Sequence, residues 1–369
     1  MSRAREFADL AGSADAGGLT GRNLIINGAM QVAQRGTSST SAGGYYTVDR
    51  IYWAKNSTTE LAVTTSQSTE APEGFSNSWR VQVTTAETAQ AAGELVYFLY
   101  QGEGQDFQHL KYGTSNAEKV TLSFWVRSSV TGTYSVLFYL TDDTRACTHT
   151  YTVNTANTWE HKTITVDGDT TGVIDNDNGS GFALYFTLSA GSSNKGTGST
   201  SFNAYTGTDF ADSNQVNFAA QTGNYYITGI QLEVGDKATP FEHRSFADQL
   251  ARCQRYFYRI GEAVVNSNAQ FTLQGRSLSS NRSDGTLMLP TPMRAVPSVS
   301  VYESSSTTLY PSNEAAITLS GETYSIVGND SAFTDLNHVN VRTSGGGTIT
   351  NGHAVNQRYS GAISLDAEL

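Results

Sequence analysis

The stretch VTLSFWVR, residues 120–127, decides the fold class because apolar and other side chains alternate along it. Successive side chains of a β-strand point to opposite faces of the sheet, so every second residue shares a face. One face is apolar throughout, and we expect it to lie on the core: Val120, Leu122, Phe124 and Val126. The opposite face carries the remaining side chains: Thr121, Ser123, Trp125 and Arg127.

The same alternation recurs along residues 22–244 and predicts eight or more short strands. Clusters rich in Gly, Ser, Asn and Asp separate the strands, and no helical pattern stands between them. We therefore expect a mainly β protein in which this segment forms an antiparallel β-sandwich of jelly-roll type. The expected strands are residues 61–66, 79–84, 120–127, 134–140, 148–153, 162–166, 182–188 and 225–234.

Three further segments complete the expected organisation. Residues 1–21 are too short to fold alone and are expected to form an N-terminal arm. Residues 245–261 carry a convincing helical pattern. Residues 262–369 are expected to form a second, smaller β-sandwich, whose strands are residues 286–289, 298–302, 316–319, 323–327, 338–342 and 359–365.

The expected helix has a clear start and stop in the sequence. Ser245 suits the N-cap, Asp248 suits the capping-box position, and Gly261 is a natural end. Its apolar residues step by 4 and 3 positions, which fits either a helix lying on a sheet of its own subunit or a self-association seam. The candidates for such a seam are Phe246, Leu250, Cys253 and Phe257.

Charge and hydropathy exclude several classes of partner. Acidic residues outnumber basic ones by 34 to 23, and Lys and Arg are scattered, so we expect no nucleic-acid binding. Apolar runs stay far below the roughly 20 residues that cross a bilayer, so we expect no membrane insertion. Residues 1–19 lack the apolar core of a secretory signal, which indicates synthesis in a cytoplasm. Cys147 and Cys253 are expected to be free thiols.

No recognisable catalytic constellation appears in the sequence. The six histidines are isolated, and the common hydrolase and dinucleotide-binding motifs are missing. We therefore expect no enzymatic activity, no cofactor and no metal. Two alternatives stay open: a carboxylate pair at Asp142 and Asp143 could hydrolyse a polysaccharide, and Asp175 with Asp177 could hold calcium on a flexible loop.

Strand parity also predicts a ligand-binding patch. It places Trp125 and Arg127 on the outer face of one strand, and Tyr139 and Tyr185 on the outer faces of two others. If these strands share a sheet, the four side chains form one aromatic and basic surface. Sugar rings stack on Trp and Tyr, and Arg bonds hydroxyl or acidic groups, so the patch predicts saccharide binding. The alternative is that a loop or a neighbouring subunit covers this face.

Four long motifs resemble a family of bacteriophage virion proteins that are common in phages of marine bacteria and cyanobacteria and are usually described as tail-fibre-like. They are NLIINGAMQVAQRGTS at 23–38, YYTVDRIYW at 45–53, GIQLEVGDKATPFEHRSFADQLARCQRYF at 229–257, and ISLDAEL at 363–369. The resemblance implies a jelly-roll similar to carbohydrate-binding modules, a helix and a C-terminal β domain, commonly in homotrimers. It supplies no functional residues.

The resemblance implies a structural protein of the virion, either a tail fibre or a head fibre or decoration. We expect residues 1–21 to attach to another virion protein, the sandwich to recognise host-surface polysaccharide, and three copies to associate with Leu250 and Phe257 near the axis. Two alternatives remain: a purely architectural decoration protein without a ligand, and a polysaccharide depolymerase.

Overall fold

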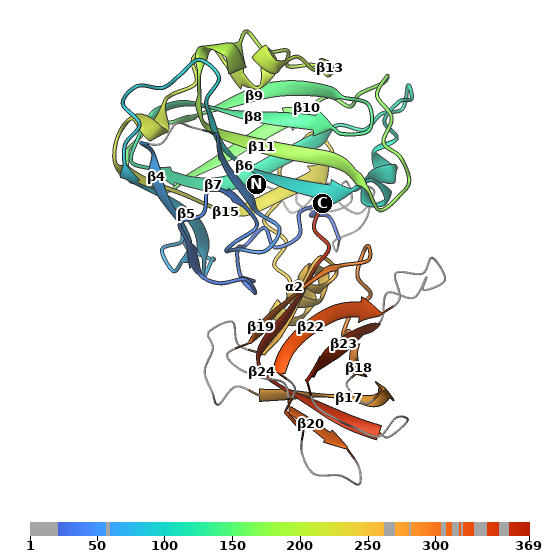
Figure 1. The fold of residues 1–369 in the computed structure, drawn as a ribbon. Helices are drawn as coiled ribbons and strands as arrows, with labels where there is room; N and C mark the ends of the chain where they lie inside the picture. The colour runs from blue at the N-terminus through green and yellow to red at the C-terminus, as the bar shows by residue number, and fades with distance from the viewer. Residues whose placement is uncertain are drawn as a thin grey trace. The chain divides into compact units, whose positions relative to one another are not determined.

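The computed structural model describes residues 21–56, 60–261, 270–279, 282–303, 308–311, 317–318, 320–327, 338–346 and 354–369. The expected N-terminal arm therefore lies outside the described residues, apart from Gly21. The chain divides into two compact units (Figure 1). The first extends to Gln249 and includes Leu369, and the second comprises Leu250–Glu368.

The first unit contains a six-stranded sheet in which all paired neighbours are antiparallel. Its strands, in order across the sheet, are β1 (Ser38–Ser39), β4 (Ala62–Ser68), β5 (Ser78–Thr85), β15 (Gly223–Val234), β7 (Val120–Ser128) and β10 (Glu160–Val166).

A seven-stranded antiparallel sheet forms the second layer of this unit. Its order is β13 (Asn203–Ala204), β9 (Arg145–Val153), β8 (Gly132–Leu140), β11 (Ser180–Ala190), β6 (Leu95–Glu103), β3 (Tyr52–Asn56) and β2 (Gly43–Gly44). Connections carry a short parallel pair and four 3₁₀ turns: β12 (Lys195–Gly196), β14 (Ala211–Asp212), η1 (Gly104–Leu110), η2 (Ser192–Asn194), η3 (Gly207–Asp209) and η4 (Phe218–Ala220).

Aromatic side chains from both sheets form the core of the sandwich. The ring centroids of Trp79 on β5 and Phe98 on β6 lie 4.8 Å apart, and those of Phe124 on β7 and Phe186 on β11 lie 5.3 Å apart. All four side chains are fully buried. Burying each stabilises the fold by about 1.5–3 kcal/mol. The predicted mainly β fold with an antiparallel β-sandwich is therefore confirmed.

The eight strands expected in residues 22–244 are all present, within a few residues of their predicted bounds. Besides the two-residue strands of this unit, the sequence analysis missed β3 and β6, although β6 lies inside the seven-stranded sheet. The reason is the sequence LVYFLY at 95–100, which is apolar on both faces and therefore shows no alternation.

The motif NLIINGAM connects the start of the described chain to β15. The Asn23 side chain accepts a hydrogen bond from the backbone N–H of Leu232 and donates one to the carbonyl of Ile230. Gly28 lies against the same strand, because a Cβ at this position would stand 2.1 Å from the Ile230 oxygen. One part of the family resemblance is thus explained by packing.

Helix α2 (Phe246–Gln254) is shorter than predicted. The backbone N–H of Asp248 donates a hydrogen bond to the Ser245 hydroxyl, so the predicted N-cap is confirmed. The predicted extent to residue 261 is wrong. The aromatic run YFYRI at 256–260 has high β-propensity, and its pairing with another strand makes it part of β16 (Phe257–Gly261).

The four residues of the predicted self-association seam therefore do not lie along one helix. Phe246 and Leu250 lie on α2, and Phe246 is 55% exposed. Cys253 is buried within the chain, and Phe257 is a buried residue of strand β16. The four side chains therefore do not form one exposed apolar face.

The described residues of the second unit form a nine-stranded β assembly. Its main path runs β21 (Ile317–Thr318), β20 (Thr308–Pro311), β24 (Ala354–Asp366), β17 (Gln270–Ser279), β18 (Arg282–Met288), β23 (His338–Gly346) and β22 (Ser320–Val327). Strands β16 and β19 (Ser298–Glu303) pair with β24 away from this path. All six strands expected after residue 262 have counterparts, and the strands that sequence analysis missed are β16, β17 and β20.

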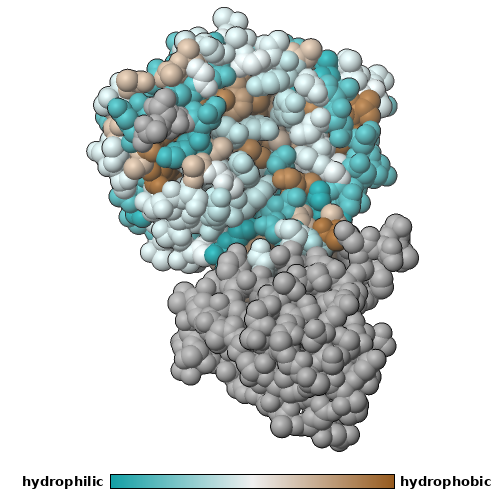
Figure 2. Space-filling view, in the orientation of Figure 1, coloured by the Kyte–Doolittle hydropathy of each residue, from teal (hydrophilic) through white to brown (hydrophobic). Residues whose placement is uncertain are grey.

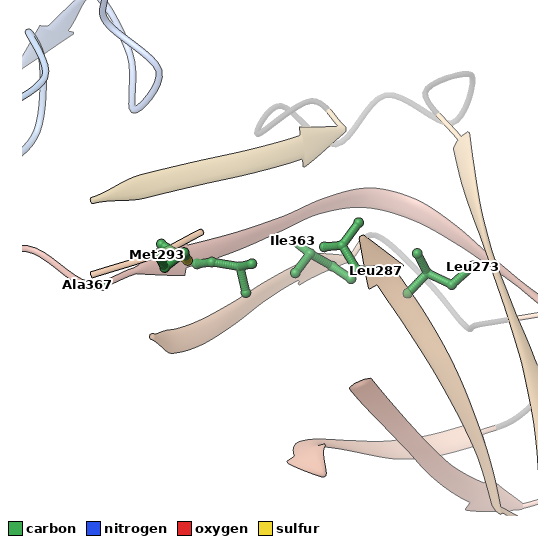
Figure 3. Close-up of a cluster of buried hydrophobic side chains, with 6 residues drawn as sticks. Leu273, Leu287, Met293, Ile363 and Ala367 are labelled. Carbon is green, nitrogen blue, oxygen red and sulfur yellow. The ribbon is translucent and has the colours of Figure 1, made fainter. Parts of the chain in front are cut away.

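Strand β24 belongs to two groups of strands. Its N-terminal part, up to Ser360, pairs with β17 and β20, whereas residues 361–366 pair with β16 and β19. A small apolar cluster lies beside the second group (Figure 3), and its buried residues are Leu273, Leu287, Met293, Ile363, Leu365 and Ala367.

Two expectations concern single features of the chain. Cys147 and Cys253 are buried and form no disulfide, as predicted. Within the described part of the chain, no helix combines the length and the apolar character that a membrane crossing requires.

Candidate functional site

The structure separates the four side chains of the predicted patch into two pairs. Trp125 and Arg127 lie on β7 of the six-stranded sheet, whereas Tyr139 on β8 and Tyr185 on β11 belong to the seven-stranded sheet. The two sheets pack face to face, so their outer faces point away from each other. The single patch required these strands to share one sheet, and this condition is not met. Parity determines the face of a side chain but not the sheet to which its strand belongs.

The predicted parity itself is confirmed. On β7 the four apolar residues from Val120 to Val126 are completely buried, and Trp125 and Arg127 are only half-buried. On β8 and β11, Tyr139 and Tyr185 are likewise half-buried on the outer side. Each pair therefore lies on a real outer face.

The outer face of the seven-stranded sheet carries a group of tyrosines that we call the tyrosine face. Its members are the two predicted tyrosines and two others, and all four rings are half-buried. Figure 2 shows the side of the first unit on which β8, β11 and β6 are seen in Figure 1; tyrosine is slightly hydrophilic on the scale used there and is not among the brown residues. The tyrosine face comprises Tyr97, Tyr139, Tyr185 and Tyr205.

The four rings contact one another in a continuous series. The centroids of Tyr97 and Tyr185 lie 5.6 Å apart, those of Tyr185 and Tyr139 6.1 Å, and those of Tyr139 and Tyr205 5.3 Å. Phe210 packs beneath, 5.2 Å from the Tyr97 ring and 5.5 Å from the Tyr185 ring. Edge-to-face contacts of this kind hold aromatic side chains in fixed orientations.

The loop that supplies Tyr205 and Phe210 is held by its own hydrogen bonds. The Tyr205 backbone N–H donates to the Thr144 carbonyl at 3.0 Å. The Thr206 backbone N–H and hydroxyl both bond the Asp209 carboxylate, which caps η3. The loop thus presents Tyr205 to the strands as a positioned side chain.

The hydroxyls of these tyrosines are available to a ligand. Within the described residues, none of the four has a hydrogen-bond partner, and none is enclosed. Burial raises the pKa of Tyr185, and it raises the pKa of Tyr97 with a further contribution from Tyr52. Burial also raises the pKa of Tyr205 to about 12. These phenols therefore stay protonated at neutral pH and can both donate and accept hydrogen bonds.

Arg127, on the other outer face, already has partners. Its guanidinium forms an ion pair with Glu70 and lies 5.2 Å from the centre of the Tyr226 ring. The Tyr226 hydroxyl donates to the same carboxylate at 3.2 Å. Trp125 lies next to His161 of β10, with ring centroids 5.1 Å apart.

The carboxylates considered for hydrolysis stabilise a loop. Asp142 accepts a hydrogen bond from the backbone N–H of Asp175 at 2.9 Å, and Asp143 accepts one from Val173 at 3.0 Å. Burial raises the pKa of Asp142. Asp177 accepts a bond from the N–H of Gly179 within the same loop. Among the described residues, no three His, Cys, Asp or Glu side chains are grouped to hold a metal ion.

Sequence reasoning missed Tyr97 and Tyr205. Tyr97 lies on β6, whose two apolar faces concealed the strand, although parity along residues 95–99 would place it outward. Tyr205 lies in a turn-rich connection, where no periodic pattern shows which side chain returns to the sheet.

Comparisons with known proteins give only distant structural similarity. No protein-family model matches the chain, and no curated protein matches it. A tailspike protein domain of bacteriophage CBA120, described as enzymatically active, aligns at 14% identity with a TM-score of 0.30, covering 57% of this chain and 21% of that one.

The family 11 carbohydrate-binding module of a cellulosomal cellulase of Clostridium thermocellum aligns at 12% identity with a TM-score of 0.27, covering 55% of this chain and 98% of the module. An exo-beta-agarase aligns at 8% identity with a TM-score of 0.32, covering 59% and 25%. The chain thus spans about a fifth of the tailspike domain and a quarter of the agarase. Similarities this low carry no conclusion about activity.

Proposed function

We propose that this protein is a non-catalytic bacteriophage virion protein, a fibre or decoration, that recognises host-surface polysaccharide through the tyrosine face. The observation that supports glycan recognition is the row of four positioned tyrosine rings with unengaged hydroxyls. Such rings stack on the C–H faces of sugars, and their hydroxyls bond sugar hydroxyls. The virion role is supported by the four motifs that resemble phage virion proteins.

The absence of catalysis is part of the proposal. Asp142 and Asp143 each bond a backbone N–H of the loop at residues 173–175. A carboxylate engaged in this way acts as a structural acceptor, which supports a binding role over hydrolysis. Incubation with host polysaccharide should release no new reducing ends, and release that Asp142→Asn abolishes would establish the depolymerase instead.

Glycan recognition is tested with purified protein and host-surface polysaccharide. The double variant Tyr139→Ala/Tyr185→Ala should lose affinity about tenfold or more, because each aromatic contact contributes roughly 0.5–1.5 kcal/mol. Trp159→Ala is the matched control, since Trp159 packs on Tyr226 of the opposite sheet. Equal affinity of the double variant and the wild type would contradict the assignment, and binding by neither would favour an architectural protein.

Attachment and assembly complete the proposal. We propose that residues 1–21 anchor the protein to another virion protein, and that three copies associate. Particles that lack this protein should lose a fibre or protrusion in negative-stain images. Light scattering should give three times the chain mass of 39.6 kDa, and a stable single-chain mass at micromolar concentration would exclude the trimer.

A further inference from the structure

A pocket opens beside Trp125 on the outer face of the six-stranded sheet. Its volume is about 460 Å³, within the range of small-molecule sites. Strands β7 and β10 supply Trp125 and His161, and the chain after β15 supplies residues 238–241. Ser123 and Gly229 complete the lining.

Gly229 makes the approach of the surrounding aromatic side chains possible. It lies in a β-bulge of β15 with a φ of +63°, a conformation that favours glycine. A Cβ there would stand 2.7 Å from the Phe75 ring and 3.2 Å from the Trp125 ring. Phe75 in turn contacts Phe241, with centroids 5.0 Å apart. The pocket wall therefore rests on a cluster of packed aromatic side chains that come from both strands and loops.

The polar groups of the pocket are few and neutral. Within the described residues, the Ser123 hydroxyl has no hydrogen-bond partner, although Ser123 is buried. His161 is exposed at its rim, and partial burial lowers the pKa of its ring, so the imidazole is neutral at pH 7. The Thr239 hydroxyl is already engaged, donating to Glu233 and accepting from Arg22.

No charged side chain is among the residues that line this pocket in the described structure. Arg127, two residues further along β7, is held by Glu70. A charged ligand would lose its hydration without gaining an opposite charge. The lining therefore selects a neutral molecule.

We propose that this pocket binds one neutral sugar residue, stacked on Trp125 and hydrogen-bonded to Ser123 and His161. A Phe, Tyr or Trp side chain of a partner protein is the main alternative, but it offers at most one polar atom to the Ser123 hydroxyl and the His161 ring. A sugar ring offers several hydroxyls beside an apolar C–H face. The site extends the proposed glycan recognition to the opposite sheet, so it can be tested separately from the tyrosine face.

The test is a titration of the full chain with glucose, galactose and N-acetylglucosamine, followed by saturation-transfer NMR. At least one sugar should bind at millimolar concentration, and Trp125→Ala should lower the affinity for that sugar about tenfold or more. Trp159→Ala is a matched control on the same sheet, outside the pocket lining. Tyr139→Ala/Tyr185→Ala should leave monosaccharide binding unchanged.

Ser123→Ala keeps the proposal testable if Trp125→Ala fails to fold. It should lower the affinity for the same sugar by a few fold. No binding of any sugar by folded wild-type protein, or binding that both Ser123→Ala and Trp125→Ala leave intact, would overturn the proposal. Tighter binding of N-acetyl-tryptophanamide than of every sugar would assign the pocket to an aromatic side chain instead. Loss of polysaccharide binding in the tyrosine variants with intact monosaccharide binding would separate the two sites.

Discussion

The two outer faces of the sandwich share one core but are built differently. On the tyrosine face, three of the four rings stand on adjacent strands β8, β11 and β6, so the sheet itself sets their spacing. On the opposite face, strands supply Trp125 and His161, and loops supply most of the remaining wall. Sheet geometry thus produces a broad surface suited to an extended chain, whereas loops over a β-bulge produce an open pocket of a size suited to one ring.

Disrupting the shared core should abolish both faces, and this is the largest effect we expect. Phe98 is fully buried between Trp79 and the stacked Phe186 ring, at centroid distances of 4.8 and 4.7 Å. Phe98→Ala should lower the free energy of unfolding by about 3–5 kcal/mol, because it leaves a cavity. Chemical denaturation measures this loss. A loss below about 1 kcal/mol would show that the two sheets do not depend on this contact.

Gly229→Ala should affect one face and spare the other. The added Cβ would clash with Phe75 and force a positive φ on alanine, so we expect a loss of about 1–3 kcal/mol in unfolding free energy. Monosaccharide binding should fall while polysaccharide binding through the tyrosine face persists. Gly207→Ala is the control, because nothing lies within 4 Å of a Cβ there and its φ is not positive. Equal effects of the two substitutions would contradict the role of Gly229.

The smallest effect we expect is a pH dependence of the tyrosine face. Burial raises the pKa of Tyr97, Tyr185 and Tyr205 in the folded protein. Below pH of about 10 both folded and unfolded chains keep these phenols neutral, so they add no pH dependence. Above it the unfolded chain ionises first, and the free energy of unfolding should fall as pH rises towards 12.

Denaturation at pH 9, 10 and 11 measures this fall. A matched series on Tyr185→Phe should show a shallower slope, because phenylalanine cannot ionise. Identical slopes for wild type and variant would show that the Tyr185 phenol is not buried enough to perturb its pKa.

Sequence reasoning predicted the face on which a side chain lies more reliably than the strands that lie next to it. Period-two alternation placed Trp125 and Tyr185 outward correctly, because that pattern follows from the geometry of a single strand. It could not assign β7 and β11 to different sheets, since sheet membership depends on pairing between distant segments. The same limit hid Tyr97, whose strand is apolar on both faces.

The predicted end of helix α2 was wrong for a related reason. Phe257 continues the spacing of Phe246 and Leu250, so a helical pattern extends through it. In the structure Phe257 pairs with Asp366 on β24, more than one hundred residues away in the sequence. Backbone pairing with a distant strand overrode the local pattern, and no local signal reports such a partner.

The position of β24 has a consequence for the order in which the protein forms during synthesis. All strands of the first unit precede residue 235, so its two sheets can close while the ribosome is still extending the chain. In the second unit, β16, β17, β19 and β20 all await a strand that follows them in the sequence. Until β24 emerges, β17 and β20 can pair only through their other edges, with β18 and β21, and β16 and β19 have no partner among the described strands. Unpaired edges invite association with other nascent chains.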